Sequence, residues 1–438
     1  MNNLQPREIV AFLDDYIIGQ DNAKKTIAIA LRNRFRRLKL DPKIRDEITP
    51  KNILMIGSSG VGKTELARRM AKMMDLPFIK VEASKYTEVG FVGRDVESMV
   101  RDLVSTSMHL VEKLQKDAMQ EEIENYVLDK ITKILLPPLS DLASEDKKQQ
   151  YQDTFAKMRQ RVKNGELDEN KIEITLPKNV QEANKNLPPE MIKMQESILK
   201  ALSSKENIKK EVPIKLAKVM LKKEAFENLS DVDDLKQRAL DLAQTSGIIF
   251  IDEIDKVATS NKSRQDPSKE GVQRDLLPIV EGSVVNTKYG QVKTDNILFI
   301  AAGAFHVSKP SDLIPELQGR FPIRVELNNL DANSLYKILK NTKNSLINQY
   351  KTLLSVEQID LHFEDEALLE IANLAALSNE KTEDIGARRL HTVIEKILED
   401  ISFESDAYKG QKIVITKEQV TQKLAFLVAN TDLSRYIL

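Results

Sequence analysis

Two short segments of this chain carry residue types and spacings that suit phosphate chemistry, and the first is the stretch 57–64, Gly-Ser-Ser-Gly-Val-Gly-Lys-Thr. A chain that wraps a phosphate must turn several N–H groups inward, and only glycine adopts such backbone conformations without steric cost. In such a loop Lys63 reaches the β- and γ-phosphates, and the Thr64 hydroxyl coordinates Mg²⁺. The stretch therefore predicts a P-loop that binds a nucleoside triphosphate with magnesium through Gly60, Val61, Gly62, Lys63, Thr64 and Glu65.

The sequence on either side of this loop predicts the elements that a P-loop needs. Residues 52–56 form a short apolar run, which is typical of a buried parallel strand. Residues 65–74 predict a helix, whose N-terminus adds the positive end of a dipole beneath the phosphates. A chance glycine turn between a strand and a helix is the alternative. The complete motif in this strand–loop–helix context favours the P-loop.

The second segment is an apolar strand, 248–251, that ends in the carboxylates of Asp252 and Glu253. Solvated turn carboxylates are the alternative, but open α/β sheets bind their ligands at the carboxyl ends of strands. There Asp252 would hold Mg²⁺ through a water, and Glu253 would orient and deprotonate the attacking water. With Asp255 the pattern becomes Asp-Glu-x-Asp, which is typical of ATPases and helicases, and the chain has no Asn-Lys-x-Asp guanine signature. The sequence therefore favours ATP.

Composition bounds the class of protein. A chain of 438 residues suggests about three domains. Its 66 basic and 67 acidic residues nearly cancel, which argues against a general affinity for nucleic acid or membranes. Cysteine is absent, which excludes disulfides and suits a reducing cytosol. The first residues lack the apolar core of a signal peptide, and no apolar run approaches the ~18 residues of a membrane span. We therefore expect a soluble, cytoplasmic protein.

The long separation between Lys63 and Asp252 indicates an insertion, because a compact P-loop domain needs far fewer residues between them. The intervening sequence is rich in Lys, Glu, Gln and Asn, with amphipathic helical stretches at 111–134 and 214–240. A disordered linker is the alternative for its central part, 140–210. We predict an α/β nucleotide-binding domain with a parallel sheet at 1–108 and 246–327, a mostly helical inserted domain at 109–245, and a mostly helical C-terminal domain at 328–438.

The rest of the chain predicts further elements of these domains. In the nucleotide-binding domain we expect a helix at 270–281, a hairpin at 283–294 and buried strands at 296–301 and 323–326. In the C-terminal domain we expect helices at 332–353, 366–377, 385–401 and 417–429, with short strands at 359–363 and 412–415.

Several stretches together carry a family resemblance that covers nearly the whole chain. They are the Tyr-Ile-Ile-Gly-Gln run at 16–20 and the segments 51–69, 88–95, 247–256, 270–282, 311–327, 386–391 and 432–438. In these segments the sequence resembles the HslU (ClpY) family of AAA+ ATPases, Clp-type unfoldases that partner HslV peptidases. The P-loop alone would indicate only a superfamily, whereas the insertion, the Gly-aromatic-Val-Gly loop and the C-terminal tail are specific.

The resemblance implies a homo-hexameric ring with ATP between subunits, and it assigns residue roles. Ile17 and Ile18 would form an apolar slot for the adenine, although on their own they are an ordinary apolar pair. Arg320 would be an arginine finger that reaches the γ-phosphate of the neighbouring subunit. Glu316 would belong to the same interface. Arg388 would be the second sensor, which couples hydrolysis to rotation of the C-terminal domain; on its own, it would be taken for part of a solvated helix face.

The loop Gly90, Phe91, Val92 and Gly93 would line the pore of the ring and grip extended polypeptide. Family members commonly have tyrosine where this chain has Phe91. Grip on the substrate through ring stacking and apolar contact should therefore be kept, whereas any hydrogen bond made by the tyrosine hydroxyl should be lost. Two other departures are Ser58-Ser59 in place of the commoner Pro-Thr, and Tyr16 where histidine is frequent. The first-sensor position after Ile300 is unclear, because the residues that follow offer no polar side chain of the usual kind.

The resemblance implies an ATP-dependent unfoldase that feeds protein substrates to a separate peptidase and activates it. The chain has no Gly-x-Ser-x-Gly or His-Glu-x-x-His motif, so it is predicted to be the motor and not the protease. Its C-terminal tail would dock on the peptidase, with simple fraying as the alternative. The tail residues are Leu433, Ser434, Arg435, Tyr436, Ile437 and Leu438.

Three other functions are less well supported. A ClpX-like unfoldase would need cysteines for its N-terminal zinc module and a surface Ile-Gly-Phe loop, and this sequence has neither. A nucleic-acid motor or clamp loader would need basic patches interleaved with aromatic residues. The net charge of −1 and the aromatic content of 5% argue against this function. A scaffold with an inactive nucleotide site is disfavoured because Glu253 and Arg320 are both present.

Overall fold

The computed structural model describes residues 4–48, 51–86, 94–139, 144–176, 208–258 and 267–429. The chain forms two compact units. One comprises Met1–Leu103, Leu242–Val285 and Lys293–Leu438, and the other comprises Val104–Asp241 and Asn286–Val292. The predicted pore loop, 90–93, and the predicted docking tail, 433–438, lie outside the described residues.

A five-stranded parallel sheet forms the centre of the first unit, in the order β2-β5-β8-β1-β9. Its strands are β1 (Ile53–Ile56), β2 (Phe78–Glu82), β5 (Ile248–Asp252), β8 (Leu298–Gly303) and β9 (Ile323–Glu326). The three central strands are almost entirely buried, which explains their continuous apolar sequences. Because all five strands run in one direction, the P-loop after β1 and the acidic end of β5 lie at the same edge of the sheet.

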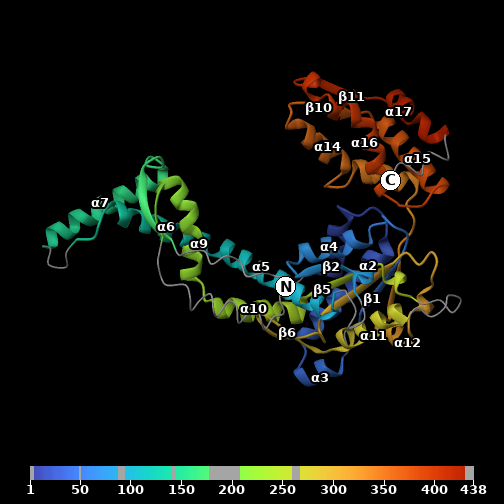
Figure 1. The fold of residues 1–438 in the computed structure, drawn as a ribbon, viewed down its shortest axis with the longest axis horizontal. Coiled ribbons are helices and arrows are strands. Elements are labelled where there is room, and N and C mark those ends of the chain that lie inside the picture. The colour runs from blue at the N-terminus through green and yellow to red at the C-terminus, as the bar shows by residue number, and fades with distance from the viewer. Residues whose placement is uncertain are drawn as a thin grey trace. The chain divides into compact units, whose positions relative to one another are not determined.

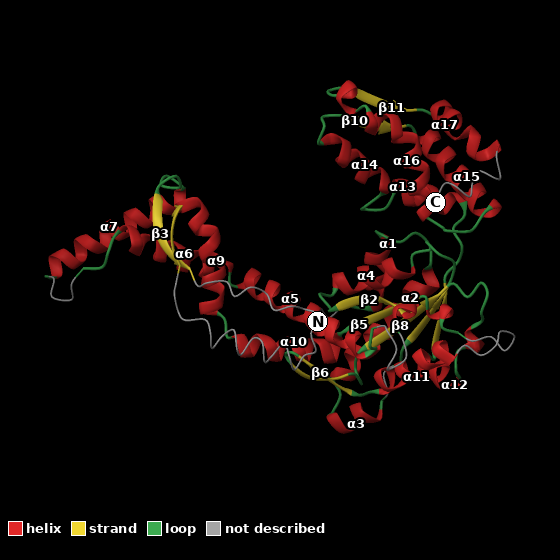
Figure 2. Cartoon of the chain, in the orientation of Figure 1, coloured by secondary structure: helices red, strands yellow, loops and turns green. Residues whose placement is uncertain are grey.

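Helices cover both faces of this sheet (Figures 1 and 2). On one side, α1 (Pro6–Asp14), α2 (Asp21–Leu38) and α4 (Lys63–Met73) share a core with β1, β5, β8 and β9. On the other side lies α11 (Pro267–Glu281), which contacts α12 (Pro315–Arg320). The remaining short elements are α3 (Pro42–Glu47) and the 3-10 helices η1 (Ala83–Lys85), η2 (Ile254–Lys256) and η3 (Pro310–Asp312). The predicted α/β class with a parallel sheet is confirmed.

The C-terminal part of the first unit has its own hydrophobic core. Its helices are α13 (Ala332–Lys340), α14 (Leu346–Ser355), α15 (Asp365–Lys381), α16 (Arg388–Phe403), η4 (Ser405–Tyr408) and α17 (Lys417–Ala429). Two short strands, β10 (Asp360–Phe363) and β11 (Lys412–Ile415), pair in parallel. Both predicted strands and the helix at 417–429 are confirmed.

The single helix predicted at 332–353 is wrong, because the chain turns between α13 and α14. Asp331 caps the first helix by accepting a hydrogen bond from the Ser334 N–H, and Ser345 caps the second through the N–H of Asn348. Leu339 before the turn and Leu346 after it are both buried in the same core. Apolar periodicity alone runs through such a turn, so it cannot locate the turn.

The second unit contains α6 (Gln120–Leu135), α7 (Glu145–Asn164) and α9 (Ile214–Leu229), together with most of α5 (Glu97–Ala118) and of α10 (Val232–Ser246). The predicted helical stretches at 111–134 and 214–240 are helical, and each is divided between two helices, with breaks near Met119 and Ser230. An antiparallel pair, β3 (Lys171–Leu176) and β4 (Ile208–Pro213), was not expected from the sequence. The predicted hairpin at 283–294 is confirmed as β6 (Val284–Thr287) and β7 (Gly290–Lys293).

Within the described ranges, no helix has both the length and the apolar character needed to cross a membrane.

Lys24 is an unusual core residue, because only 1% of it is exposed. Its ammonium donates to Asp14 Oδ1 and to the carbonyl oxygen of Ile17, both at 2.6 Å. We expect Lys24→Met to lower the free energy of unfolding by about 1–3 kcal/mol, because it leaves that buried carbonyl without its donor. Urea denaturation checks this, with the exposed neighbour Lys25→Met as the matched control. Equal stability of the two variants would contradict the structural role of Lys24.

Candidate nucleotide-binding site

A cavity of about 610 Å³ opens at the edge of the sheet where the central strands end. Its lining comes from the P-loop, the end of β5, the turn after β8, the N-terminal segment and the C-terminal helices. These residues are Tyr16, Ile17, Ile18, Ser59, Gly60, Val61, Gly62, Lys63, Thr64, Glu65, Asp252, Glu253, Asp255, Lys256, Gly303, Ala304, His306, Leu330, Ile338, Glu383, Asp384, Ala387, Arg388 and His391. The structure thus brings residues far apart in the sequence to one cavity.

The P-loop has the local geometry that its glycines predict. Gly60 and Gly62 have φ angles of 72° and 102°, and Gly62 stands directly before α4. Lys63 begins that helix and donates to the carbonyl oxygens of Gly57 at 2.5 Å and Ser58 at 2.7 Å. Burial lowers the pKa of Lys63, although the carboxylates of Asp252 and Asp255 oppose this shift.

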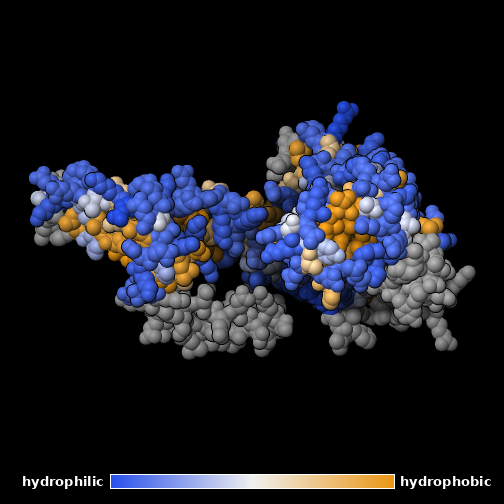
Figure 3. Space-filling view, turned by 90° about the horizontal axis from the view of Figure 1, so that it is seen from above, coloured by the Kyte–Doolittle hydropathy of each residue, from blue (hydrophilic) through white to orange (hydrophobic). Residues whose placement is uncertain are grey.

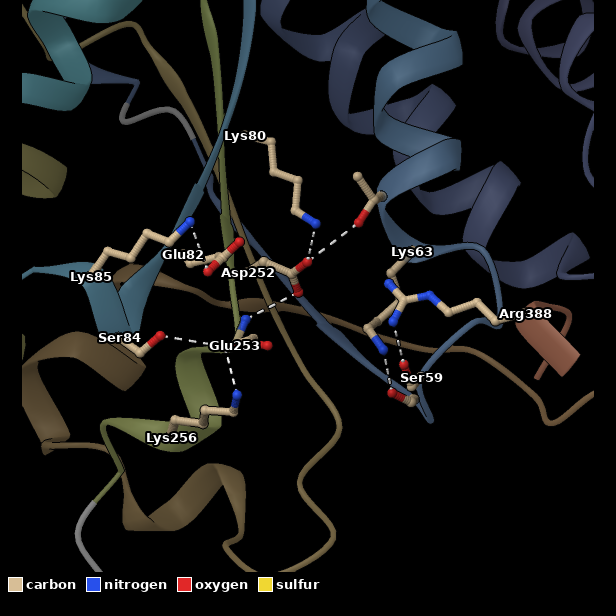
Figure 4. Close-up of polar contacts among 12 residues, drawn as sticks. Ser59, Lys63, Lys80, Glu82, Ser84, Lys85, Asp252, Glu253, Lys256 and Arg388 are labelled. Carbon is tan, nitrogen blue, oxygen red and sulfur yellow. Dashed lines mark hydrogen bonds and ion pairs between the residues drawn. The ribbon is translucent and has the colours of Figure 1, made fainter. Parts of the chain in front are cut away.

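Oxygen atoms suited to a hard divalent cation converge at the end of β5. The Thr64 hydroxyl lies 3.5 Å from Asp252 Oδ2, and the same carboxylate oxygen lies 2.8 Å from the Lys80 ammonium (Figure 4). Hydroxyl and carboxylate oxygens are ligands that Mg²⁺ accepts, usually together with waters and phosphates. Thr64 and Asp252 therefore fit a magnesium ion. Lys80, on the neighbouring strand β2, was not predicted from the sequence, since a lysine within a strand carries no motif.

Glu253 adopts an uncommon backbone conformation, with a φ angle of 57°. Its carboxylate accepts hydrogen bonds from Lys256 at 2.7 Å and from the Ser84 hydroxyl at 3.4 Å (Figure 4). The hydrogen bond to Glu253 raises the pKa of Lys256. A carboxylate held just beyond the strand end in this way is placed to accept a proton in the cavity.

The N-terminal segment forms one wall of the cavity. Ile17 is buried and Ile18 is partly exposed, and both line the cavity as an apolar slot for adenine requires. The guanidinium of Arg69 lies 4.2 Å from the centre of the Tyr16 ring, a cation–π contact that histidine would make less well. Burial raises the pKa of Glu65, but hydrogen bonds from Arg68 and Arg69 outweigh this effect and lower it overall.

The C-terminal helices reach the P-loop directly. Arg388 begins α16 and donates from Nη1 to the Ser59 hydroxyl at 3.2 Å (Figure 4). The N–H of Ala387 donates to the Gly60 carbonyl at 3.2 Å. At Gly386, which has a φ angle of 57°, an added Cβ would lie 2.7 Å from the Gly60 carbonyl carbon. The two chain segments therefore touch through their backbones.

We expect Gly386→Ala to raise the KM for ATP about tenfold, because the added methyl group must displace the P-loop by a fraction of an ångström. Gly410→Ala is the matched control. Gly410 also has a positive φ angle, 75°, but a Cβ there would meet nothing within 4 Å. Both variants have the strain of a left-handed alanine, so only Gly386→Ala should alter KM in steady-state ATPase assays. The same KM for both variants would show that the P-loop contact is unimportant.

The predicted finger residues do not line this cavity in their own chain. Arg320 ends α12 and forms an ion pair with Glu281 at 2.9 Å, and Glu316 lies exposed in the first turn of the same helix. Sequence reasoning also missed His306, on the turn after β8 where a first sensor was sought. Asp255 holds this turn, since its carboxylate accepts a hydrogen bond from the Phe305 N–H at 3.2 Å.

Comparisons with known proteins agree with this geometry. A family model described as "ATPase family associated with various cellular activities (AAA)" matches residues 53–188, and one described as "AAA domain (Cdc48 subfamily)" matches residues 170–324. The chain is 61% identical over 439 residues to the ATP-dependent protease ATPase subunit HslU of Helicobacter pylori strain G27, covering 100% of this chain and 99% of that protein. It is 60% identical over 438 residues to the HslU of Campylobacter jejuni serotype O:2, covering 100% of both.

The P-loop and the carboxylates after β5 converge on one cavity, and the likeness to these proteins extends over the full length of the chain. Both the ATPase activity and the family expected from the sequence are thereby confirmed. The chain is an ATPase that belongs to the HslU family, the ATPase subunits of ATP-dependent proteases.

Proposed function

We propose that this ATPase unfolds protein substrates and translocates them into an HslV-type peptidase, which it also activates. The observation that carries the proposal is the cavity in which the P-loop, Glu253 and Arg388 of the C-terminal helices come together. An ATPase whose C-terminal domain contacts the phosphate-binding loop can convert a change at the phosphate into a domain movement. The related subunits of Helicobacter and Campylobacter are named as ATPases of ATP-dependent proteases.

In this proposal each residue of the cavity has one task. Lys63 binds the β- and γ-phosphate oxygens, and Ile17 and Ile18 enclose the adenine. Thr64 and Asp252 would hold Mg²⁺, which supplies positive charge to the phosphate oxygens when it is bound. Glu253 accepts the proton of the attacking water. Arg388 contacts the γ-phosphate and reports its loss.

The proposed active form is a homo-hexameric ring. Arg320 does not line the cavity of its own chain, which fits a finger that enters the site of a neighbouring copy. Large hydrophobic side chains also lie exposed, with Leu353, Val356 and Phe403 at 64, 80 and 88% exposure. Figure 3 shows hydrophobic residues interrupting a mostly hydrophilic face. Contiguous exposed apolar surface on a folded chain favours assembly with a partner.

Other parts of the proposal rest on the family resemblance. Phe91 in the pore loop would grip substrate, the tail 433–438 would dock on the peptidase, and the complex would act in the cytoplasm. The pore loop and the tail lie outside the described residues.

The test is ATP-dependent degradation of a folded, tagged protein by an HslV-type peptidase, with the intact chain and with a chain that lacks Arg435–Leu438. We expect the intact chain to support degradation, and the truncated chain to keep its ATPase activity without activating the peptidase. An intact chain that hydrolyses ATP but never activates the peptidase would overturn the partner assignment. Stimulation of the ATPase by DNA, and not by a loosely folded protein, would favour the nucleic-acid motor instead.

A further inference from the structure

The second residue of the P-loop joins this loop to the linker that leads into the C-terminal helices. Ser58 is 6% exposed. Its hydroxyl donates to Asn329 Oδ1 at 2.9 Å. Asn329 lies in the short linker between β9 and α13. The P-loop therefore contacts this linker by a side-chain hydrogen bond, in addition to the contacts of Ser59 and Gly60 with the start of α16.

The linker is anchored on both sides of Asn329. Before it, the side-chain amide of Gln20 bonds both backbone groups of Asn328, donating to its carbonyl at 2.8 Å and accepting from its N–H at 2.9 Å. After it, Asp331 caps α13. Any rotation of the C-terminal helices about this linker must change the backbone torsion angles between these two anchors. Asn329, which Ser58 contacts, lies between them.

Ser58 also contacts the phosphate-binding lysine. Its carbonyl oxygen accepts a hydrogen bond from Lys63 Nζ at 2.7 Å. Lys63 carries three protons, and two of them go to the carbonyls of Gly57 and Ser58. Bonding oxygens of both the β- and the γ-phosphate therefore requires Lys63 to give up one of these carbonyls. A phosphate that draws Lys63 away therefore alters the residue whose hydroxyl holds the linker.

We propose that Ser58 is a positioning residue that links occupancy of the phosphate site to the angle of the C-terminal domain. The Ser58–Asn329 bond stabilises the linker arrangement in which Lys63 is bonded to the carbonyls of its own loop, and nucleotide binding releases it. This inference rests on the proposed function.

The test measures the distance between two dyes on the full chain, with Lys72→Cys on α4 and Lys409→Cys in the C-terminal domain. Both lysines are exposed, and the chain has no cysteine of its own, so labelling is specific. Labelled chains are diluted with unlabelled ones so that only distances within one chain are read. MgADP and a non-hydrolysable MgATP analogue are titrated into the parent, Ser58→Ala, Asn329→Ala and the double variant.

We expect Ser58→Ala to shift the domain equilibrium toward the nucleotide-bound distance by about three- to tenfold, as the loss of one hydrogen bond predicts. Nucleotide affinity should rise by at most the same factor. Asn329→Ala should cause the same shift, and the double variant should add nothing. Ser58→Thr, which keeps the hydroxyl, should restore the parent behaviour. Ser355→Ala is the matched control, because the Ser355 hydroxyl donates to the Thr352 carbonyl oxygen within the same turn of α14.

The proposed role of Ser58 would be overturned if Ser58→Ala left the dye-distance equilibrium unchanged. It would also be overturned if the shifts caused by Ser58→Ala and Asn329→Ala added together in the double variant. A parent chain that binds nucleotide and changes its dye distance in that experiment would leave the proposed function intact. A parent that binds no nucleotide would overturn the proposed function, and the proposed role of Ser58 with it.

Discussion

Replacing Glu253 by glutamine is expected to lower kcat for ATP hydrolysis by roughly 10²–10⁴-fold, the usual contribution of a positioned general base. The amide keeps the size and the hydrogen-bonding oxygen of the side chain but cannot accept the proton of the attacking water. ATP binding should be retained, because Lys63 and Asp252 are untouched. Single-turnover hydrolysis together with equilibrium binding of ATP measures the two effects separately.

The fold should tolerate this change, since the ion pair of Glu253 with Lys256 is partly exposed and such pairs contribute little stability. Glu82→Gln is the matched control. Glu82 ends the neighbouring strand β2, pairs in register with Asp252 and forms an ion pair with Lys85 at 3.1 Å, but it does not line the cavity. The Glu82→Gln variant should hydrolyse ATP at the parent rate. A Glu253→Gln variant that retains near-parent kcat would exclude Glu253 as the base.

Replacing Arg320 by alanine is expected to reduce kcat by roughly 10³–10⁵-fold, as the loss of an arginine finger does in other nucleotide hydrolases. In its own chain Arg320 is ion-paired with Glu281 at 2.9 Å, so under the proposed finger role it would exchange this partner for a phosphate of the adjacent subunit. Arg324→Ala, an exposed arginine on β9, is the control and should hydrolyse ATP at the parent rate.

A mixing experiment tests whether the finger acts between subunits. Lys63→Met chains keep Arg320 but lose ATP binding, whereas Arg320→Ala chains bind ATP but lack the finger. Mixed rings should therefore hydrolyse ATP faster than either variant alone. Mixtures that stay as inactive as their components, under conditions in which subunits exchange, would place the function of Arg320 within its own chain.

The structure also shows how α12, which carries Arg320, is joined to the segment that follows Glu253. Gln273 on α11 is fully buried, and its side chain donates to the carbonyl of Val257 at 2.7 Å. The same side chain accepts from the N–H of Ile314 at 2.8 Å, directly before α12. Val257 follows Glu253 by one short helical turn. One buried amide thus bridges the chain after Glu253 and the helix that carries Arg320.

The amino-acid sequence is enough to locate the elements whose signals are local. Glycines at 57, 60 and 62, an apolar strand on one side and a helix on the other define a P-loop because its chemistry is confined to consecutive residues. The same holds for the strand that ends in Asp252 and Glu253, and for the parallel sheet that these apolar runs build. Recognition of the family from motifs spread along the chain is confirmed by the full-length comparisons.

Which distant residues contact one another depends on the tertiary fold. Lys80 pairs with Asp252 because β2 lies next to β5 in register, and Ser58 reaches Asn329 because β1 and β9 are neighbours in the sheet. The turn between α13 and α14 also depends on packing, since helices on both sides bury leucines in one core. Pairing and packing are set by contacts between residues distant in sequence, so the spacing of residue types along the chain carries no signal for them.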